Sequence, residues 1–546
     1  MSELITQKTL WENFDPTAEP LDAVVVRSDV IDGLTFKQLY FTSTSFEDGT
    51  KTRVFAVVCH KGDKPSKNAV LLIDSYSKPI SLDDLRFFAE NGFTAMSIDL
   101  KGRVEKGKHT VYAPSEDFCN ADVARSLFYV DDGIHNNKLY RYAVMCMRAI
   151  THLIQNENAQ NVSVVTVGLG TYVGTIVLAI DNRVTNGSIV FGAVYRDYGN
   201  KKQTEADLSD REELAAHLAY EEKRQLWLMG LAPQSYVMQI KVPVYIITSA
   251  NSELGNVEDI SRMFYRINDE SRLLVLPNTI EHLNDFYAKS VINWCKGKKP
   301  EEELSVTSSL DENGDYYVTT NSSATAKKLS VWYCVKADGR TKHWMRATIT
   351  RTGGESRAKL NLYEKDCEVL VFALLDADVA ISSPLTKIKV ENAHNLILPS
   401  NIIFSGTGTQ ELIPFDIQGR WRGDNVSYEK AAGYLNIVGA KGNAFATYAI
   451  SDENIRRSIT YTISFDVCCT VKQTLTVSVV HGFESEREVY SEEVQLLGDG
   501  KWQRIVVDEK DFKRDSDGKS IPADENCNLL MIWAKEQFII NNIIIV

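Results

Sequence analysis

Between residues 65 and 300 the chain alternates short apolar runs with amphipathic stretches. Residues 69–73 are apolar without a break, as in a strand that is buried on both faces of a parallel sheet. Apolar side chains then recur at three- and four-residue steps from Leu139 to Leu153, which is the spacing of one helical face. Further strand patterns lie at residues 162–167, 189–194, 244–247 and 273–276. This order predicts a doubly wound, mostly parallel sheet covered by helices over residues 65–298.

Two flanking patterns complete the predicted α/β domain. Residues 1–64 contain alternating stretches, such as residues 53–58, which favour antiparallel strands that lead into the sheet. Residues 205–231 are charged and helical in pattern and lie between two predicted strands. We expect this segment to form a helical cap over the carboxyl edge of the sheet.

Beyond residue 300 the helical pattern nearly disappears. The charged, proline-containing run at residues 296–303 is typical of the end of a domain. Short strand patterns separated by Gly, Asn and Asp turns favour an immunoglobulin-like sandwich over residues 303–392. A glycine-rich linker precedes another all-β segment over residues 410–546, for which we predict a jelly roll. The sequence therefore predicts a multidomain protein.

Charge and cysteine usage exclude several classes of partner. The formal net charge of −13 disfavours nucleic acids and anionic membranes, because both need a basic surface. The N-terminal residues are polar and acidic where a signal peptide needs an apolar core, and no apolar run approaches the ~20 residues of a membrane span. The nine cysteines are scattered without metal-type spacing. We therefore expect a cytoplasmic protein with reduced thiols and with no metal or cofactor, although a non-classical export route stays open.

The strand at residues 162–167 runs into a glycine cluster. A sharp strand-to-helix turn of the pattern Gly-x-Ser-x-Gly carries the nucleophile of α/β-hydrolases. The stretch that begins at Gly168 places Gly170 at the nucleophile position, and the alternative register places Tyr172 there. Thr171 is adjacent, but neighbouring positions on such a turn point elsewhere. Neither register supplies a serine, cysteine or aspartate.

The other two members of a catalytic triad have candidate positions. Asn251 follows the strand near residue 245, where the acid is expected, and Glu253 lies two residues further on. An amide can orient a histidine but cannot stabilise an imidazolium as a carboxylate does. His282 follows the last strand of the domain, where the histidine is expected, although a lone histidine in a loop is more often structural.

These segments resemble the acetyl xylan esterase group of α/β-hydrolases. Residues 89–103 resemble the strand of that group that leads into an Asp-x-Arg-Gly turn, and residues 231–245 resemble its approach to the acid-bearing strand. The resemblance covers about residues 20–296. It implies an α/β-hydrolase fold and, where the site is intact, hydrolysis of acetyl esters on sugars.

The same resemblance implies a degenerate site. The His-Gly-Tyr oxyanion loop of the group appears here as Asp74-Ser75-Tyr76, which keeps only the tyrosine. Gly170 replaces its serine and Asn251 replaces its aspartate, so that only His282 is retained. A carboxylate at Asp74 would also oppose a developing oxyanion electrostatically.

The C-terminal segment is similar to carbohydrate-binding jelly rolls at residues 500–507 and 538–545. The similarity implies a saccharide that stacks on exposed aromatic rings. Trp421 and Tyr428, in a glycine- and charge-rich stretch, are the candidates for this platform. Trp502 and Trp533 lie on predicted strands, and we expect them in the core.

Three interpretations of function follow. The first is a pseudo-hydrolase that binds a saccharide or a protein partner. The second is a divergent esterase or deacetylase on acylated sugars, with Tyr172, Thr171 or Ser75 as its nucleophile. The third is a structural scaffold that assembles as a homo-oligomer.

Overall fold

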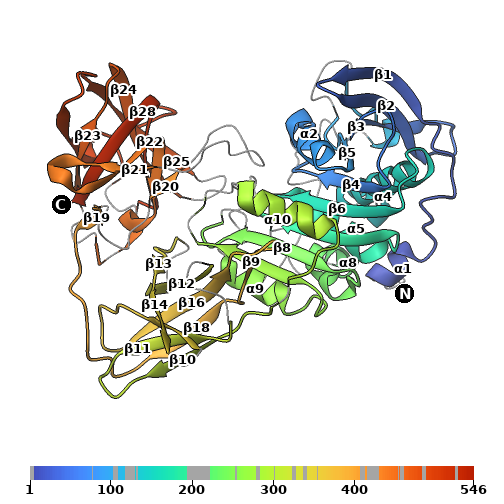
Figure 1. Cartoon of the computed structure of the whole chain (residues 1–546). Helices are drawn as coiled ribbons and strands as arrows, with labels where there is room; N and C mark the ends of the chain where they lie inside the picture. The colour runs from blue at the N-terminus through green and yellow to red at the C-terminus, as the bar shows by residue number, and fades with distance from the viewer. Residues whose placement is uncertain are drawn as a thin grey trace. The chain divides into compact units, whose positions relative to one another are not determined.

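The structure is a computed structural model, which describes residues 5–76, 78–102, 108–116, 130, 133–192, 222–252, 255–277, 279, 283, 285–300, 302–322, 328–335, 341–352, 355–405, 412–414, 429–452, 454–455, 460–482, 487–522 and 527–546. The chain divides into two compact units (Figure 1). Unit 1 comprises residues 1–248, 258–273 and 289–299, and unit 2 comprises residues 249–257, 274–288 and 300–546.

Unit 1 contains most of a nine-stranded sheet, whose strand order is β1-β2-β3-β5-β4-β6-β7-β8-β9; residue 249 of β8 and residues 274–276 of β9 are counted in unit 2. The strands are β1 (Val24–Ile31), β2 (Leu34–Ser45), β3 (Lys51–Lys61), β4 (Asn68–Ile73), β5 (Thr94–Ile98), β6 (Asn161–Val167), β7 (Val184–Val190), β8 (Val244–Ser249) and β9 (Arg272–Leu276). Strands β1, β2 and β3 pair antiparallel, and so do β3 and β5. From β5 through β4, β6 and β7 to β8 every pairing is parallel. The predicted α/β sheet and the antiparallel strands before it are therefore present.

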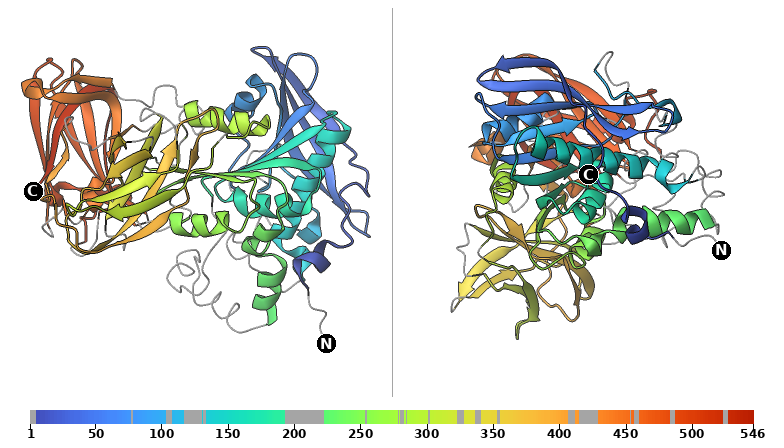
Figure 2. Two further views of the ribbon diagram at one scale, coloured as in Figure 1. Left: turned by 60° about the horizontal axis from the view of Figure 1, so that its bottom comes forward. Right: turned by 90° about the vertical axis from the view of Figure 1, so that its right-hand side faces the viewer.

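Helices cover this sheet because each parallel connection crosses over it. The helices are α1 (Gln7–Trp11), α2 (Leu82–Glu90), α4 (Lys138–Gln155), α5 (Gly170–Ile180), α8 (Glu222–Gly230), α9 (Val257–Phe264) and α10 (Asp285–Cys295). The connection through α2 runs from β4 to β5, which lies on the β3 side of β4. The connections through α4 (β5 to β6) and α5 (β6 to β7) run in the opposite direction across the sheet. Right-handed crossovers therefore put α2 on one face and α4 and α5 on the other, and Figure 2 shows helices on both sides of the sheet.

Parts of the predicted cap and of the candidate site lie outside the described residues. Of the cap at residues 205–231, the structure describes the part from residue 222, which includes α8. His282, Glu253, Trp421 and Tyr428 all fall outside the described residues. Within the described part of the chain, no helix combines the length and apolar character that a bilayer crossing requires.

Unit 2 is dominated by antiparallel sheets. Its strands are β10 (Val306–Leu310), β11 (Tyr316–Thr320), β12 (Leu329–Val335), β13 (Met345–Arg346), β14 (Thr348–Thr352), β15 (Glu355–Lys359), β16 (Cys367–Leu375), β17 (Ile381–Ser382), β18 (Thr386–Val390), β19 (Ile402–Phe404), β20 (Ile413–Pro414), β21 (Glu429–Ala432), β22 (Val438–Thr447), β23 (Thr462–Cys468), β24 (Gln473–His481), β25 (Glu488–Leu496), β26 (Trp502–Asp508), β27 (Lys513–Arg514) and β28 (Leu529–Ile545). A four-stranded sheet (β10-β11-β15-β14) and a five-stranded sheet (β13-β12-β16-β17, with β18 on β16) share one hydrophobic core. The strands from β19 onward form a ten-stranded sheet around a second core. The all-β prediction is confirmed, and the immunoglobulin-like and jelly-roll assignments stay predictions.

The prediction that Trp502 and Trp533 lie in the core is wrong. Both side chains are half-buried, and neither belongs to the core of the ten-stranded sheet. On β26 it is Ile505 and Val507 that enter the core. Because side chains alternate along a strand, Trp502 lies on the opposite, outward face.

Candidate active-site turn

Gly168 makes the sharp bend between β6 and α5. It has a φ of +55°, in the left-handed region that side-chain-bearing residues rarely adopt. The next residue, Leu169, is already helical in conformation at φ −66° and ψ −18°, and α5 begins at Gly170. The N–H of Gly168 donates to the carbonyl oxygen of Val190 over 3.0 Å. The bend therefore lies two residues before Gly170.

Gly170 has no room for a side chain. A Cβ atom at this position would lie 2.4 Å from the carbonyl oxygen of Ile73 and 2.5 Å from that of Asp74. Both oxygens are backbone atoms where β4 ends, so they cannot rotate away as the tip of a side chain would. A serine or cysteine at Gly170 would require the end of β4 to move.

The loop after β4 closes over this turn. The N–H of Leu169 donates to Ser75 Oγ over 3.1 Å, and Ser75 is buried. The Asp74 carboxylate accepts a hydrogen bond from the N–H of Ser75 over 2.6 Å. Tyr76 is also buried, with its ring centroid 6.2 Å from that of Tyr142. The residues expected to line an oxyanion pocket thus pack and hydrogen-bond within unit 1.

Thr171 and Tyr172 differ in their access to solvent. Thr171 is fully buried, and its Oγ1 lies 3.3 Å from Thr166 Oγ1. Tyr172 is half-buried, and its N–H donates to the carbonyl oxygen of Leu169 over 3.2 Å. Of these two candidate nucleophiles, therefore, Tyr172 alone has part of its side chain exposed.

Asn251, in unit 2, is held by the backbone of Lys342. Its Nδ2 donates to the carbonyl oxygen of Lys342 over 2.8 Å, and the N–H of Lys342 donates to Asn251 Oδ1 over 2.8 Å. The side chain of Ser249 supports the same loop by accepting from the N–H of Asn251 and donating to the carbonyl oxygen of Thr279. Asn251 is buried, and both ends of its amide already have a partner. These bonds link the loop after β8 to the backbone at Lys342.

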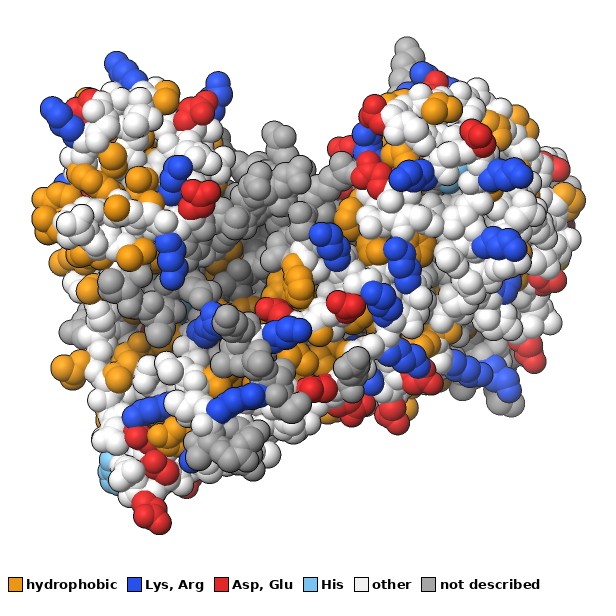
Figure 3. Space-filling model, viewed as in Figure 1, with side chains coloured by type: hydrophobic (Ala, Val, Ile, Leu, Met, Phe, Trp, Pro, Cys, Tyr) orange, Lys and Arg blue, Asp and Glu red, His pale blue; other side chains and the backbone are white. Residues whose placement is uncertain are grey.

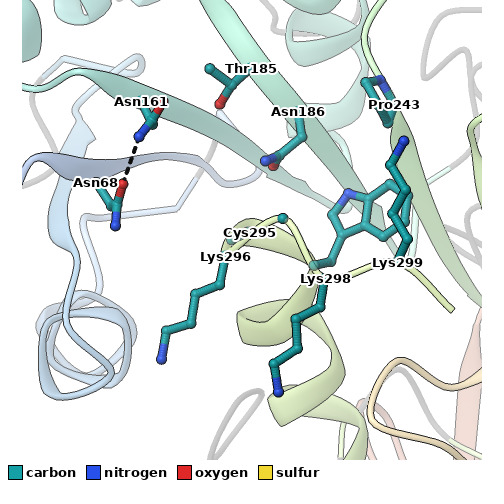
Figure 4. Close-up of a pocket in the computed structure, with 11 residues that line it drawn as sticks. Asn68, Asn161, Thr185, Asn186, Pro243, Cys295, Lys296, Lys298 and Lys299 are labelled. Carbon is teal, nitrogen blue, oxygen red and sulfur yellow. Dashed lines mark hydrogen bonds between the residues drawn. The ribbon is translucent and has the colours of Figure 1, made fainter.

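A cavity of about 310 Å³ lies at the edge of the unit 1 sheet where the parallel strands begin (Figure 4). Asn68 and Asn161 line it where β4 and β6 begin, and Asn161 Nδ2 donates to Asn68 Oδ1 over 2.9 Å. Lys296 and Lys298 come from the segment after α10, and in Figure 4 their side chains point away from the two asparagines. The turn at Gly168, by contrast, follows the carboxyl end of β6. The cavity is therefore separate from the candidate active-site turn.

Sequence reasoning missed two features of this turn. The position of the bend was ambiguous because glycines at residues 168, 170 and 174 allow overlapping registers. The hydrogen bond between Ser75 and Leu169 has no local sequence signal, because the two residues are far apart in the chain.

Among the described residues, no group of three His, Cys, Asp or Glu side chains is placed to hold a metal ion.

Comparison with known proteins gives similarities of limited extent. The model of the PhoPQ-activated pathogenicity-related protein family matches residues 173–341. No curated protein matches the chain. An acetyl xylan esterase from Paenibacillus sp. R4 is 12% identical with a TM-score of 0.44, over 53% of this chain and 92% of its own. Acetyl xylan esterase 1 from Thermoanaerobacterium sp. JW/SL YS485 is 14% identical with a TM-score of 0.37, over 50% of this chain and 88% of its own. A cold-adapted esterase from an Arctic intertidal metagenomic library is 16% identical with a TM-score of 0.30, over 46% of this chain and 87% of its own.

Proposed function

We propose that unit 1 is a hydrolase-like fold that has lost serine-esterase chemistry, and that the protein acts by binding. The observation that carries this proposal is the closed turn between β6 and α5. In an active α/β-hydrolase this turn presents a nucleophile, and the N–H of the next residue stabilises the oxyanion. Here the strained position is Gly168, which has no side chain to present.

The oxyanion position is also occupied from within the chain. If Gly168 stands at the nucleophile position, the N–H of Leu169 is the donor that would face a tetrahedral intermediate. That N–H already bonds to Ser75 Oγ. A substrate carbonyl would have to displace a buried hydroxyl before it gained any stabilisation, which removes the preorganisation on which oxyanion catalysis depends.

The alternative of a divergent esterase has weak support at each candidate nucleophile. Thr171 is fully buried, and Ser75 is buried with its Oγ engaged by Leu169. Asn251 is tied to Lys342, so it offers no carboxylate and no unoccupied amide end to orient His282. Tyr172 is the candidate that retains some exposure.

Ester turnover tests this proposal. The purified full chain would be assayed with p-nitrophenyl acetate and acetylated xylo-oligosaccharides, beside His282→Ala and Tyr172→Phe. We expect every rate to equal the buffer rate. Turnover by the wild type that either substitution abolishes would overturn the proposal and support the divergent esterase.

A surface of the C-terminal sandwich is the proposed binding site, and we name it the β26 surface. It consists of Tyr434, Leu435, Trp502 and Arg504. Tyr434 and Trp502 have ring centroids 6.1 Å apart at 61°, and both rings are partly exposed. Leu435 is 75% exposed and has a φ of +54°, a strained conformation for a branched side chain.

Arg504 gives this surface a fixed hydrogen-bond donor. Its Nε and Nη2 donate to the two carboxylate oxygens of Asp466 over 2.6 and 2.9 Å, and Asn542 Nδ2 donates to the same carboxylate. Donation of these hydrogen bonds to the Asp466 carboxylate raises the pKa of Arg504, which stays charged. Partly exposed rings beside a fixed guanidinium suit a saccharide, whose ring has an apolar face and a rim of hydroxyls.

Glycan binding with a matched tryptophan control tests this site. Full-length wild type, Trp502→Ala and Trp533→Ala would be applied to a glycan array and then titrated calorimetrically with the best ligand. Trp533 is a suitable control because it is also half-buried but lies on β28, outside the β26 surface. We expect Trp502→Ala to lower the affinity at least tenfold and Trp533→Ala to leave it unchanged. Absence of any glycan ligand, or equal loss in both variants, would contradict the proposal.

A further inference from the structure

Strand β1 exposes five apolar side chains at the edge of the unit 1 sheet. It is the first strand in the sheet order, with β2 as its neighbour. Its exposed apolar side chains are Val24 (53%), Val25 (53%), Val26 (55%), Val30 (73%) and Ile31 (47%). Figure 3 shows hydrophobic side chains interspersed with charged ones on the part of the surface where Figure 1 draws β1. A long apolar edge strand is a template for pairing with another chain.

The sequence of β1 is self-complementary. Ser28 lies at the centre, with Arg27 before it and Asp29 after it. Two apolar residues, Val25 and Val26, precede Arg27, and two more, Val30 and Ile31, follow Asp29. Side chains at equal distances before and after Ser28 therefore match in size and polarity, and the two charged ones have opposite signs. A strand with this pattern is complementary to an antiparallel copy of itself.

We propose that β1 pairs antiparallel with β1 of a second copy of this chain, about a two-fold axis at Ser28. In this register Arg27 of each copy lies opposite Asp29 of the other, which gives two cross-strand ion pairs. Val30 and Ile31 of each copy then face the segment of the other copy that carries Val25 and Val26, where the bulge shifts the register. Opposite charges directly across two antiparallel strands stabilise the pair.

Neighbouring registers are disfavoured by the same side chains. A slip of one residue in either direction places one charged side chain opposite a valine and the other charged side chain opposite Ser28. A slip of two residues places Arg27 opposite Arg27, or Asp29 opposite Asp29. Like charges directly opposite each other destabilise a strand pair, so the register centred on Ser28 is the one that the charges select.

One local feature of β1 fits this arrangement. Arg27 and Asp29 already form an ion pair within the strand, with Nε and Oδ2 2.6 Å apart. Both charges therefore lie on the same face, where two copies would bring four charges of alternating sign together. A bulge between Val25 and Arg27 interrupts the pairing with β2, and the part from Arg27 to Ile31 is regular. The bulge and the charges also discourage pairing with unrelated strands.

The proposed pairing is independent of the closed turn. It uses an edge strand of the unit 1 sheet and none of the residues near Gly168. A failure of this inference would leave the loss of esterase chemistry unaffected, and the reverse also holds.

Charge-swap complementation tests the interface on the full chain. Sedimentation or light scattering would give the mass of the wild type at tens of micromolar, and we expect a dimer of the 61.3 kDa chain. Arg27→Asp and Asp29→Arg should each raise the dimer dissociation constant at least tenfold, because each creates two like-charge oppositions. An equimolar mixture of the two variants should restore a dimer, because the aspartate introduced at position 27 faces the arginine introduced at position 29.

The mixture separates pairing between chains from a structural role within one chain. If Arg27 and Asp29 served only their intrachain ion pair, the mixture would behave as the average of its components. A wild type that is monomeric, or a mixture that stays monomeric, overturns the inference. As a second readout, Ser28→Cys should form a disulfide-linked dimer upon mild oxidation with copper–phenanthroline, while the wild type stays uncrosslinked. Failure of this crosslink in a dimeric variant would place the interface elsewhere.

Discussion

At the scale of single residues, Gly168 and Gly170 are needed for different reasons. Gly168 supplies a left-handed backbone conformation, whereas Gly170 supplies space against the end of β4. The two requirements together produce a sharp strand-to-helix turn in which neither position carries a side chain.

Substitution at Gly170 separates space from backbone conformation. Gly170→Ala should lower the free energy of unfolding by about 3 kcal/mol, because the added methyl group overpacks against backbone. Gly33→Ala is the control, since Gly33 has a φ of +76° and open space around its Cβ position. The Gly33→Ala substitution should lower the free energy of unfolding by about 1–2 kcal/mol. Chemical denaturation measures both values, and a smaller loss at Gly170 than at Gly33 would show that the turn is not closed as described.

Asn251 gives the second residue-level prediction. Asn251→Asp should lower the free energy of unfolding by about 2 kcal/mol, because the buried carbonyl oxygen of Lys342 loses its donor. The substitution should also create no ester turnover, although it restores the carboxylate of a triad. Asn401→Asp, an exposed position in the same unit, should change stability little. Gain of activity in Asn251→Asp would assign Asn251 to a catalytic acid position instead.

How far the candidate site can be read from the sequence differs from residue to residue. The absence of a serine in the glycine cluster is visible directly. The register of the bend is not, because overlapping glycine spacings are equivalent until a φ angle distinguishes them. The links from Ser75 to Leu169 and from Asn251 to Lys342 join distant segments, and tertiary contacts of this kind leave no periodic signal.

At the scale of elements, the strands follow the hydrophobic pattern closely. The unbroken apolar run before residue 74 is β4, and the helical spacing from Leu139 to Leu153 lies within α4. Trp502 and Trp533 were misplaced because size and apolarity alone do not say which face of a strand a side chain occupies. Only the register of β26 and β28 against their neighbours decides that.

A contact between a histidine and an aspartate in two loops of unit 2 gives the element-level prediction. His343, just before β13, has its Nδ1 2.8 Å from Asp452 Oδ2. Burial raises the pKa of Asp452, but the hydrogen bond and charge of His343, with hydrogen bonds from Asn454, outweigh it and leave that pKa below its ordinary value. A lowered carboxyl pKa stabilises the folded state above the unfolded pKa of about 4, and this stability is lost as the pH falls through the folded pKa.

The stability difference between wild type and Asp452→Asn should therefore depend on pH. It should be constant between about pH 5 and pH 6 and should shrink progressively below about pH 4. Denaturant unfolding at a series of pH values measures the difference. A difference that stays the same down to pH 2 would mean that Asp452 contributes no ionised-state stability.

At the scale of the whole molecule, unit 1 is a mixed sheet covered by helices, and unit 2 is dominated by antiparallel sheets. The architecture places the β26 surface in unit 2 and the self-complementary strand β1 in unit 1. Pairing through β1 would give two copies of the β26 surface in one particle. A dimer should then bind a multivalent glycan more tightly than the monomeric Arg27→Asp variant does, and surface-immobilised ligand at two densities would measure this avidity. Equal apparent affinity at both densities would show that the two sites do not act together.

Covalent labelling tests the proposed loss of serine-esterase chemistry most directly. The full chain would be incubated with a fluorophosphonate probe, and the intact-protein mass would be compared with that of an active serine esterase treated in parallel. The closed turn predicts no adduct on this chain and stoichiometric labelling of the control. A stoichiometric adduct that peptide mapping places on Ser75, Thr171 or Tyr172 would contradict the account and identify the nucleophile.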